Sequence, residues 1–191
     1  GVLLDVGEHI AADAQAAVGF FGRAEEVHPT SWAPRIGQGS ALVQLVEPQA
    51  ALRAFDEAQR LGATQALVAL DRGLAFDLIG DQTRAQSDYR AVLAGPDQQE
   101  ARRRLALSLG ISGRKAEALA ALDPLLARRD AAAVRVRALV LALNGDAEGA
   151  RAAVAASMPG MAGTMDPFFR RLPALRANEK AAAVHFGYLP G

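Results

Sequence analysis

The chain contains no cysteine. Disulfide bonds, zinc–thiolate sites and thiol catalysis are therefore excluded, and cysteine usage indicates no particular redox compartment. Aromatic residues are also scarce, at 5% of the 191 residues, whereas alanine is abundant. Because strands favour β-branched and aromatic side chains while alanine favours closely packed helices, this composition predicts an all-α fold. A chain of this length is expected to form one continuous body.

Neither sign of charge is in excess, since the chain has 21 basic and 21 acidic residues. A neutral protein has no net field to attract nucleic acid or an anionic membrane surface, so we expect neither as a partner. No apolar run approaches the roughly 20 residues that a membrane-spanning helix needs, so we predict no transmembrane segment. The chain begins at Gly1 rather than at a methionine. We therefore expect that a leader or an earlier segment has been removed.

Residue patterns that carry chemistry are also few. Asp5, His9 and Asp13 share one helix face at i, i+4 spacing, but a solvated face explains them better than a metal ion does. The serines match no nucleophile-elbow pattern, and the stretch 37–39 (GQG) lacks the third glycine and the preceding strand of a dinucleotide loop. We therefore predict that the protein is not an enzyme and that it uses no cofactor and no metal.

An internal repeat is the strongest feature that the sequence does contain. A small residue followed four positions later by an aromatic residue recurs in steps of 34 residues, as Ala17 with Phe21, Ala51 with Phe55, and Ala85 with Tyr89. Gly39 and Gly73 keep the same spacing. Small residues at these positions let two helices of one unit approach closely. The aromatic rings are expected to fill the gap toward the next helix pair.

Turn residues agree with units of two helices each. Gly80, Gly113 and Gly145 stand where a helix end favours a left-handed residue, and in two cases an aspartate follows that can cap the next helix. We also expect Pro48 in the first turn of a helix. The sequence predicts a partial first pair at 2–27 and full pairs over these ranges: 31–61, 65–94, 98–128 and 131–157.

Beyond residue 157 the repeat frame is lost while large apolar residues continue. We expect a loop at 158–165 and two short helices at about 166–172 and 177–187, which cap the last helix pair. The residues expected to make this contact are Phe168, Phe169, Leu172, Val184 and Phe186. The three methionines at 158, 161 and 165 are expected to fill gaps beneath the cap.

The 34-residue period with its A-x-x-x-F pattern resembles the tetratricopeptide repeat over roughly 2–157. This resemblance implies a right-handed superhelical solenoid of antiparallel helix pairs over residues 1–157, with about four full repeats and a partial first one, and a helical cap over 158–191. In that family a concave groove, lined mainly by the first helix of each repeat, binds partner proteins. The resemblance places in that groove Ile36, Val43, Leu67, Leu70, Leu74, Arg103, Leu107, Arg135 and Leu139, and also the polar Asp77.

Such a groove is mostly apolar and carries two arginines, so it suits an amphipathic helix or an extended apolar segment of a partner. It lacks the Lys and Asn pattern with which some chaperone-binding members clamp a C-terminal carboxylate. We expect Arg103 and Arg135, at the same position of adjacent repeats, to orient the bound segment. The alternative is that the leucines pack inside a tight superhelix and bind nothing.

Residues 100–118 (EARRRLALSLGISGRKAEA), with 135–158 after them, resemble the tetratricopeptide lipoproteins of tight-adherence (Flp-type) pilus systems. Arg104 stands where that group has an asparagine. The resemblance implies a pilotin-like assembly factor whose partner is an outer-membrane secretin subunit or another pilus component. It also implies a lipid anchor upstream and a place in the bacterial periplasm or at the inner face of the outer membrane.

Two other interpretations stay open. The ending 185–191 (HFGYLPG) also fits the repeat region of a cell-envelope protein that carries a separate peptidoglycan-binding domain after Gly191. A regulatory repeat domain of a larger enzyme is the third possibility. Without a removed leader, the expected location is the cytoplasm.

Overall fold

The computed structural model describes the backbone of residues 2–191 and the side chains of residues 9–191. Within these residues the secondary structure is entirely helical, with no strand, as the composition predicted. The first nine α-helices are α1 (Val2–Val27), α2 (Ala33–Gln44), α3 (Pro48–Arg60), α4 (Gln65–Leu78), α5 (Gln82–Ala91), α6 (Gln98–Ile111), α7 (Lys115–Ala127), α8 (Ala131–Leu143) and α9 (Ala147–Ser157). The remaining elements are η1 (Pro159–Met161), α10 (Ala162–Arg171), η2 (Leu172–Ala174) and α11 (Ala177–Phe186), where η marks a 3-10 helix.

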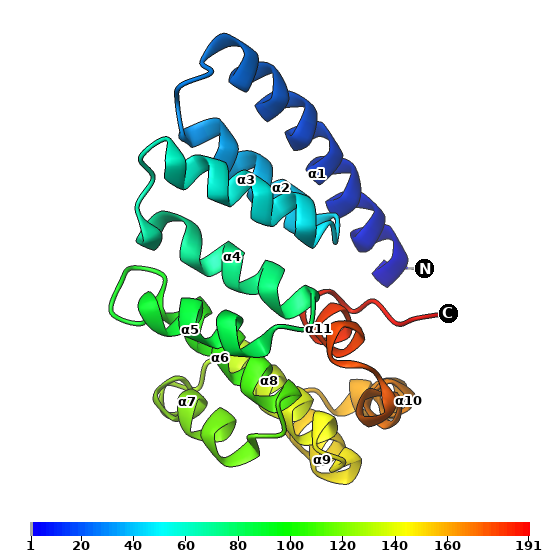
Figure 1. The fold of residues 1–191 in the computed structure, drawn as a ribbon. Coiled ribbons are helices and arrows are strands. Elements are labelled where there is room, and N and C mark those ends of the chain that lie inside the picture. The colour runs from blue at the N-terminus through cyan, green and yellow to red at the C-terminus, as the bar shows by residue number, and fades with distance from the viewer. Residues whose placement is uncertain (1) are drawn as a thin grey trace.

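Successive helices pack as neighbouring pairs, with α2 on α3, α4 on α5, α6 on α7 and α8 on α9 (Figure 1). The first helices of these pairs also contact one another, α2 with α4, α4 with α6 and α6 with α8. They therefore form a continuous inner layer, and the second helices lie on the outside. The four full pairs have the positions that the repeat frame predicted.

The first 27 residues differ from the prediction. In place of a partial helix pair they form the single helix α1, which packs on α2. Gly19 and Gly22 both stay helical within it, and neither has a positive φ. Because a glycine ends a helix only where the backbone turns left-handed, α1 continues through both positions.

The turns between paired helices agree with the sequence. Gly80, Gly113 and Gly145 have φ angles of +87°, +77° and +86°. After the first and last of these turns, the side chains of Asp81 and Asp146 accept hydrogen bonds from backbone N–H groups of the next helix. Pro48 is the first residue of α3, as predicted. These local signals end and restart the helices without help from distant contacts.

Glycines in the inner helices make room for aromatic rings. A Cβ atom added to Gly39 would lie 2.5 Å from the ring of Phe55, and one added to Gly73 would lie 2.6 Å from the ring of Tyr89. Both rings are fully buried. Each ring thus seats against the glycine of its own helix pair, rather than only between pairs as the sequence suggested. Any side chain at these glycines would meet the ring.

The C-terminal segment starts its helix earlier than predicted. Residues 158–165 were expected to form a loop, but η1 and the first turn of α10 occupy 159–165, and Gly163 lies in that turn. Helix α10 packs on α9 and α8, next to the last helix pair. Helix α11 instead turns back along the inner layer and packs on α4 and α6. Figure 1 shows both helices on the same side of the stacked pairs.

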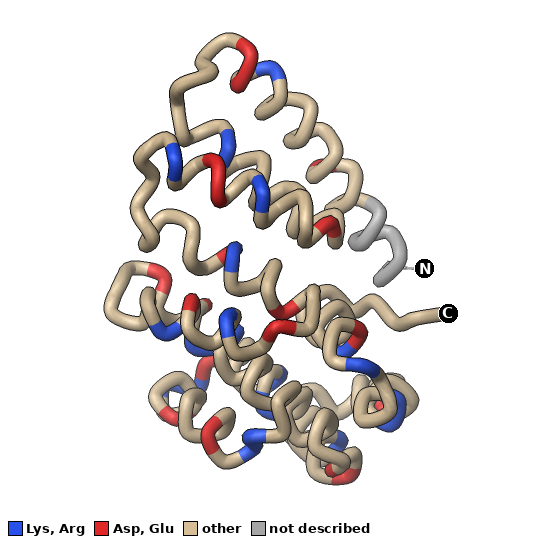
Figure 2. The backbone as a smooth tube through the Cα atoms, in the orientation of Figure 1, with Lys and Arg blue, Asp and Glu red and all other residues tan. Residues whose placement is uncertain are grey.

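Basic and acidic residues lie interspersed along the helices (Figure 2). Among the helices of the described chain, none combines the length and the apolar character that crossing a membrane requires. Large apolar side chains gather instead in one core that runs from α2 to α11.

Candidate functional site

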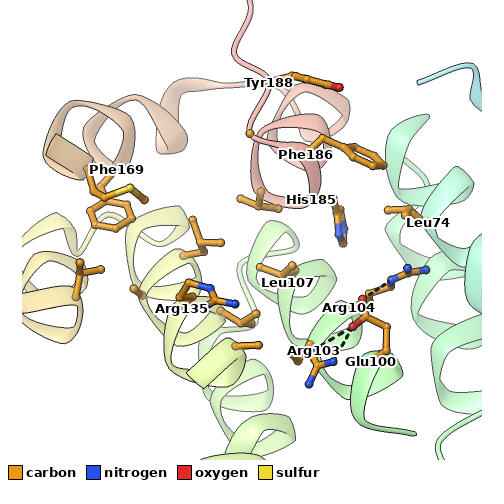
Figure 3. A pocket seen from close by; sticks show the side chains of 18 of the residues that line it. Leu74, Glu100, Arg103, Arg104, Leu107, Arg135, Phe169, His185, Phe186 and Tyr188 are labelled. Carbon is orange, nitrogen blue, oxygen red and sulfur yellow. Dashed lines mark hydrogen bonds and ion pairs between the residues drawn. The ribbon is translucent and has the colours of Figure 1, made fainter. Parts of the chain in front are cut away.

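A cavity of about 1060 Å³ lies against the inner layer of helices. Its wall is formed by α4, α6 and α8, and Figure 3 shows α10 and the C-terminal part of α11 bordering it. Ile10 and Ala11 of α1 also line it. Most lining side chains are apolar. Pockets of this size, with an apolar wall and a few convergent polar groups, are the usual binding sites of folded proteins.

Ten residues were expected in the groove, and one of them, Asp77, is fully buried and does not line the cavity. The structure divides the other nine into two groups. Those that line the cavity are Leu74, Arg103, Leu107, Arg135 and Leu139. The other four lie elsewhere: Val43 is fully buried, Ile36 and Leu70 are partly buried against the core, and Leu67 is 49% exposed outside the cavity. The cavity thus occupies the half of the inner layer that the C-terminal segment covers.

The methionines form part of the cavity wall. Met158, Met161 and Met165 line it together with Phe169. Met158 and Met165 pack on the core as gap-filling residues would, but Met161 is 37% exposed. Flexible thioether side chains adapt to surfaces of irregular shape, so this wall can follow the contour of a bound apolar group.

Two neighbouring arginines of α6 are held by carboxylates. Arg103 contacts Glu100 at 2.7 Å and Asp130 at 3.2 Å, and Arg104 contacts Glu100 at 2.9 Å and Asp71 at 2.9 Å. Figure 3 shows both guanidinium groups turned toward Glu100. The guanidinium group of Arg103 is therefore already paired with two carboxylates of the protein, and binding an acidic group of a partner would require it to share these ion pairs.

The ion pairs join the inner helices into one row. Asp71 of α4 also accepts a hydrogen bond of 2.6 Å from Ser40 of α2, so the row runs from α2 through α4 and α6 to the start of α8. Burial by itself would raise the pKa of Glu100. Hydrogen bonds and charges from Arg103 and Arg104 outweigh burial and hold that pKa below its usual value. Glu100 therefore stays ionised near neutral pH.

Arg135 of α8 differs from these two arginines. Its side chain is exposed at the cavity, and within residues 9–191 no hydrogen bond or ion pair to its guanidinium group is found. Figure 3 shows it at the cavity wall, away from the Glu100 cluster. Arg135 is thus the cation at this site that a bound carboxylate could pair with directly.

A buried carboxylate lies behind the cavity. Asp77 of α4 is fully buried. Its Oδ1 accepts a hydrogen bond of 2.7 Å from the hydroxyl of Ser108, and its Oδ2 accepts one of 2.9 Å from the hydroxyl of Tyr89. Nε2 of His185, from α11, lies 3.1 Å from Oδ2, and the side chain of His185 is only 4% exposed. Helices α4, α5, α6 and α11 therefore meet at one carboxylate.

The protonation of Tyr89 follows from this environment. Burial, together with the negative charge of Asp77, raises the pKa of Tyr89 well above its usual value. The phenol therefore remains protonated and acts as a donor. Gln86 extends the cluster, because its amide donates to the hydroxyls of Ser108 and Ser112 at 3.3 and 2.9 Å.

The sequence placed Asp77 in the groove, where the structure does not leave it exposed. Neither the ion pairs around Glu100 nor the hydrogen bonds around Asp77 were predicted, although the sequence held a signal for the second cluster. In the 34-residue frame, Asp77 and Tyr89 stand where the preceding pair has Val43 and Phe55. Such a joint change from apolar to polar residues indicates a hydrogen-bonded pair. No feature of the sequence indicates that His185, 108 residues further along, completes it.

Neither the family models nor the curated proteins nor the solved structures contain a match to this chain. The candidate metal cluster also finds no support, because no group of three His, Asp or Glu side chains in the described part of the chain could hold an ion. The side chain of Asp5 lies outside the described residues.

Proposed function

We propose that the protein is a non-enzymatic interaction scaffold that binds an apolar segment of a partner protein in the cavity on its inner layer. The observation that carries this proposal is the pairing of a large, mostly apolar cavity with the unpartnered cation of Arg135 at its wall. A helix or extended segment with an apolar stripe and an acidic residue beside it complements both features. Binding proceeds by burial of the stripe, and the ion pair with Arg135 fixes the orientation.

The more specific form of the proposal is a tetratricopeptide-repeat protein with right-handed superhelical geometry. The 34-residue frame and the neighbouring helix pairs support it. Within that form, residues 100–118 support a pilotin-like factor of a tight-adherence pilus, whose partner is a secretin subunit or another assembly component. The protein then acts in the periplasm or at the inner face of the outer membrane, held by a lipid anchor upstream.

Affinity capture with matched variants tests the binding site. Leu139 lines the cavity, whereas Leu67 is exposed away from it. Leu139→Glu places a carboxylate in the apolar wall and should abolish capture of the partner, identified by mass spectrometry from the native source. Leu67→Glu should capture it as the native chain does. Circular dichroism of both variants confirms that they are folded.

Charge reversal at Arg135 tests the orientation. Arg135→Glu should weaken capture, and the loss should diminish as salt concentration rises, because salt screens exposed charges. Equal capture by the Leu139→Glu and Leu67→Glu variants would place the partner outside the cavity and overturn the proposal.

A further inference from the structure

Helix α11 lies on the inner layer of helices, where the proposed function places the partner. It packs on α4 and α6, which are first helices of two neighbouring pairs, and its last residues line the cavity. Figure 3 shows His185 and Phe186 of α11 reaching toward Leu74 and Leu107 on these two helices. The inner layer thus already accommodates one helix, which belongs to the chain itself.

The apolar side chains that α11 buries most completely are small. Its well-buried apolar side chains are Ala181, Ala183 and Val184. The helix pairs, by comparison, bury whole rings such as Phe55 and Tyr89. A helix of 10 residues is too short to persist alone in water, so α11 depends on this contact. Because buried apolar area is the main stabilising contribution, α11 is held less firmly than the paired helices.

The contact between α11 and the inner layer also has a polar part, which involves one residue on each side. His185 is the one side chain of α11 that reaches the buried carboxylate of Asp77, at 3.1 Å. An occupant without a hydrogen-bond donor at this point would leave the carboxylate short of a partner in an apolar environment. Asp77 therefore distinguishes between helices that bring a donor and helices that do not.

We propose that the face of α4 and α6 beneath α11 is a docking site for a partner helix that replaces α11, and that Asp77 selects a helix carrying a donor among small apolar residues. The inference rests on the proposed function, because it places the partner on the same inner layer. Helix α11 acts as an internal competitor. When it leaves, its face becomes continuous with the cavity that it borders.

A peptide of residues 175–191 tests the exchange without knowledge of the partner. In the native chain, the attached α11 competes at an effective concentration in the millimolar range, so a labelled peptide should bind weakly. His185→Ala in the full chain weakens the attached helix, and the peptide should then bind about tenfold more tightly, as measured by fluorescence anisotropy. The matched control peptide, with alanine at the histidine position, should bind neither protein well.

Equal binding of the two peptides to the His185→Ala protein would remove the role of Asp77 and overturn the inference. So would a failure of the His185→Ala protein to bind the native peptide. Hydrogen exchange of the full chain gives a second measurement: the amides of 177–186 should exchange faster in this variant while those of α4 and α6 remain protected.

A reversible lock gives the sharpest test, because the chain has no native cysteine. A Cβ at Gly80 would lie 4.0 Å from Cβ of Asn178, at the start of α11, which is within the range of a disulfide. Gly80→Cys with Asn178→Cys, added to His185→Ala, should bind the peptide when reduced and lose binding at least about tenfold when oxidised. The strain of a cysteine at Gly80 is common to both redox states. Equal binding by both forms would show that α11 does not leave.

The two proposals fail separately. If an oxidised Gly80→Cys, Asn178→Cys protein still captures the partner and capture still requires Leu139, the proposed function stands and the docking inference falls. If the Leu139→Glu protein captures the partner as well as the native chain does, the proposed function is wrong, irrespective of how the 175–191 peptide binds.

Discussion

The first and second full helix pairs share one frame and differ at its centre. In α2–α3 the buried positions are Val43 and Phe55, and 34 residues later in α4–α5 they are Asp77 and Tyr89. All four side chains are fully buried, and a glycine of the same helix pair lies against each aromatic ring. One frame thus accepts an apolar pair or a hydrogen-bonded pair at the same place.

The difference gives a reason why, of these two pairs, the second contacts the C-terminal helix and the first does not. Buried valine and phenylalanine side chains need only apolar contacts, whereas a buried carboxylate needs several hydrogen-bond donors. Tyr89 and, at 3.5 Å, Gln82 donate from α5, and Ser108 and His185 contribute from α6 and α11. The polar pair therefore connects distant elements, while the apolar pair is complete within its own unit.

Placing the polar residue in the apolar pair should have the largest effect. Val43→Asp buries a carboxylate with no donors arranged around it, which should lower the free energy of unfolding by about 3–5 kcal/mol. Urea denaturation measures the loss. Adding Phe55→Tyr, to imitate the second pair, should recover part of it. A single variant as stable as the native chain would show that the two pairs are not equivalent in packing.

The converse change should cost less. Asp77→Val leaves the donors of Tyr89, Ser108 and His185 without their acceptor, and we expect a loss of about 3 kcal/mol. Tyr89→Phe in the same chain removes one stranded hydroxyl, so the double variant should be more stable than Asp77→Val alone. A double-mutant cycle by urea denaturation gives the coupling between the two side chains. Simple additivity would argue against the pair as a unit.

The glycine shared by both pairs should be needed equally in each. Gly39→Ala and Gly73→Ala push a Cβ into the rings of Phe55 and Tyr89, and each should cost about 1–3 kcal/mol. Gly22 of α1 is the matched control, since no atom lies within 4 Å of its added Cβ. Gly22→Ala should raise stability by up to about 1 kcal/mol through helix propensity. Thermal melts compare the three.

The turns of the two pairs should show a smaller difference. Gly80 has a φ of +87°, whereas its counterpart Val46 adopts a φ of 56° with a branched side chain. Gly80→Ala imposes similar backbone strain on the second pair and should cost about 1 kcal/mol in urea denaturation. Ser87→Ala, on the exposed face of α5, should change stability by less.

Acid should affect the ion pairs of the later units, with the smallest effect. Because the folded state lowers the pKa of Glu100, its contribution to stability is present above the pKa of the unfolded state and is lost as pH falls through the lower, folded value. Urea denaturation at pH 7 and pH 3 should therefore show a smaller loss for Glu100→Gln than for the native chain. An equal loss in both proteins would mean that other carboxylates determine the acid response.

Local patterns in the sequence were sufficient for the paired helices. The turn glycines and the capping aspartates act between residues a few positions apart, and the 34-residue recurrence repeats these local signals along the chain. The structure confirms the helix pairs and turns that they predict. The first helix was predicted less well, because Gly19 and Gly22 carry no signal of whether the backbone turns left-handed there. Helix α10 was placed too late because Gly163 is tolerated in a first turn.

The residues that line the candidate site follow partly from the period of the sequence and partly from the tertiary structure. Five of the ten expected groove residues line the cavity, since positions on the inner face of a repeating helix follow from the period. Apart from the buried Asp77, the others lie elsewhere because the C-terminal segment covers only part of the inner layer. That cover could not be predicted, since Ala181 and Val184 are compatible with many helix surfaces.

By itself, the sequence determined that the protein is helical and where most helices begin and end, because propensity and turn chemistry are local. Only the tertiary structure decided that α11 returns to α4 and α6, that His185 completes the donors around Asp77, and that Arg135 is left facing the cavity. Those outcomes depend on burying a carboxylate and apolar surface between segments far apart in the chain. The free energy of such contacts is set by shape and by the loss of water, which no short stretch of sequence records.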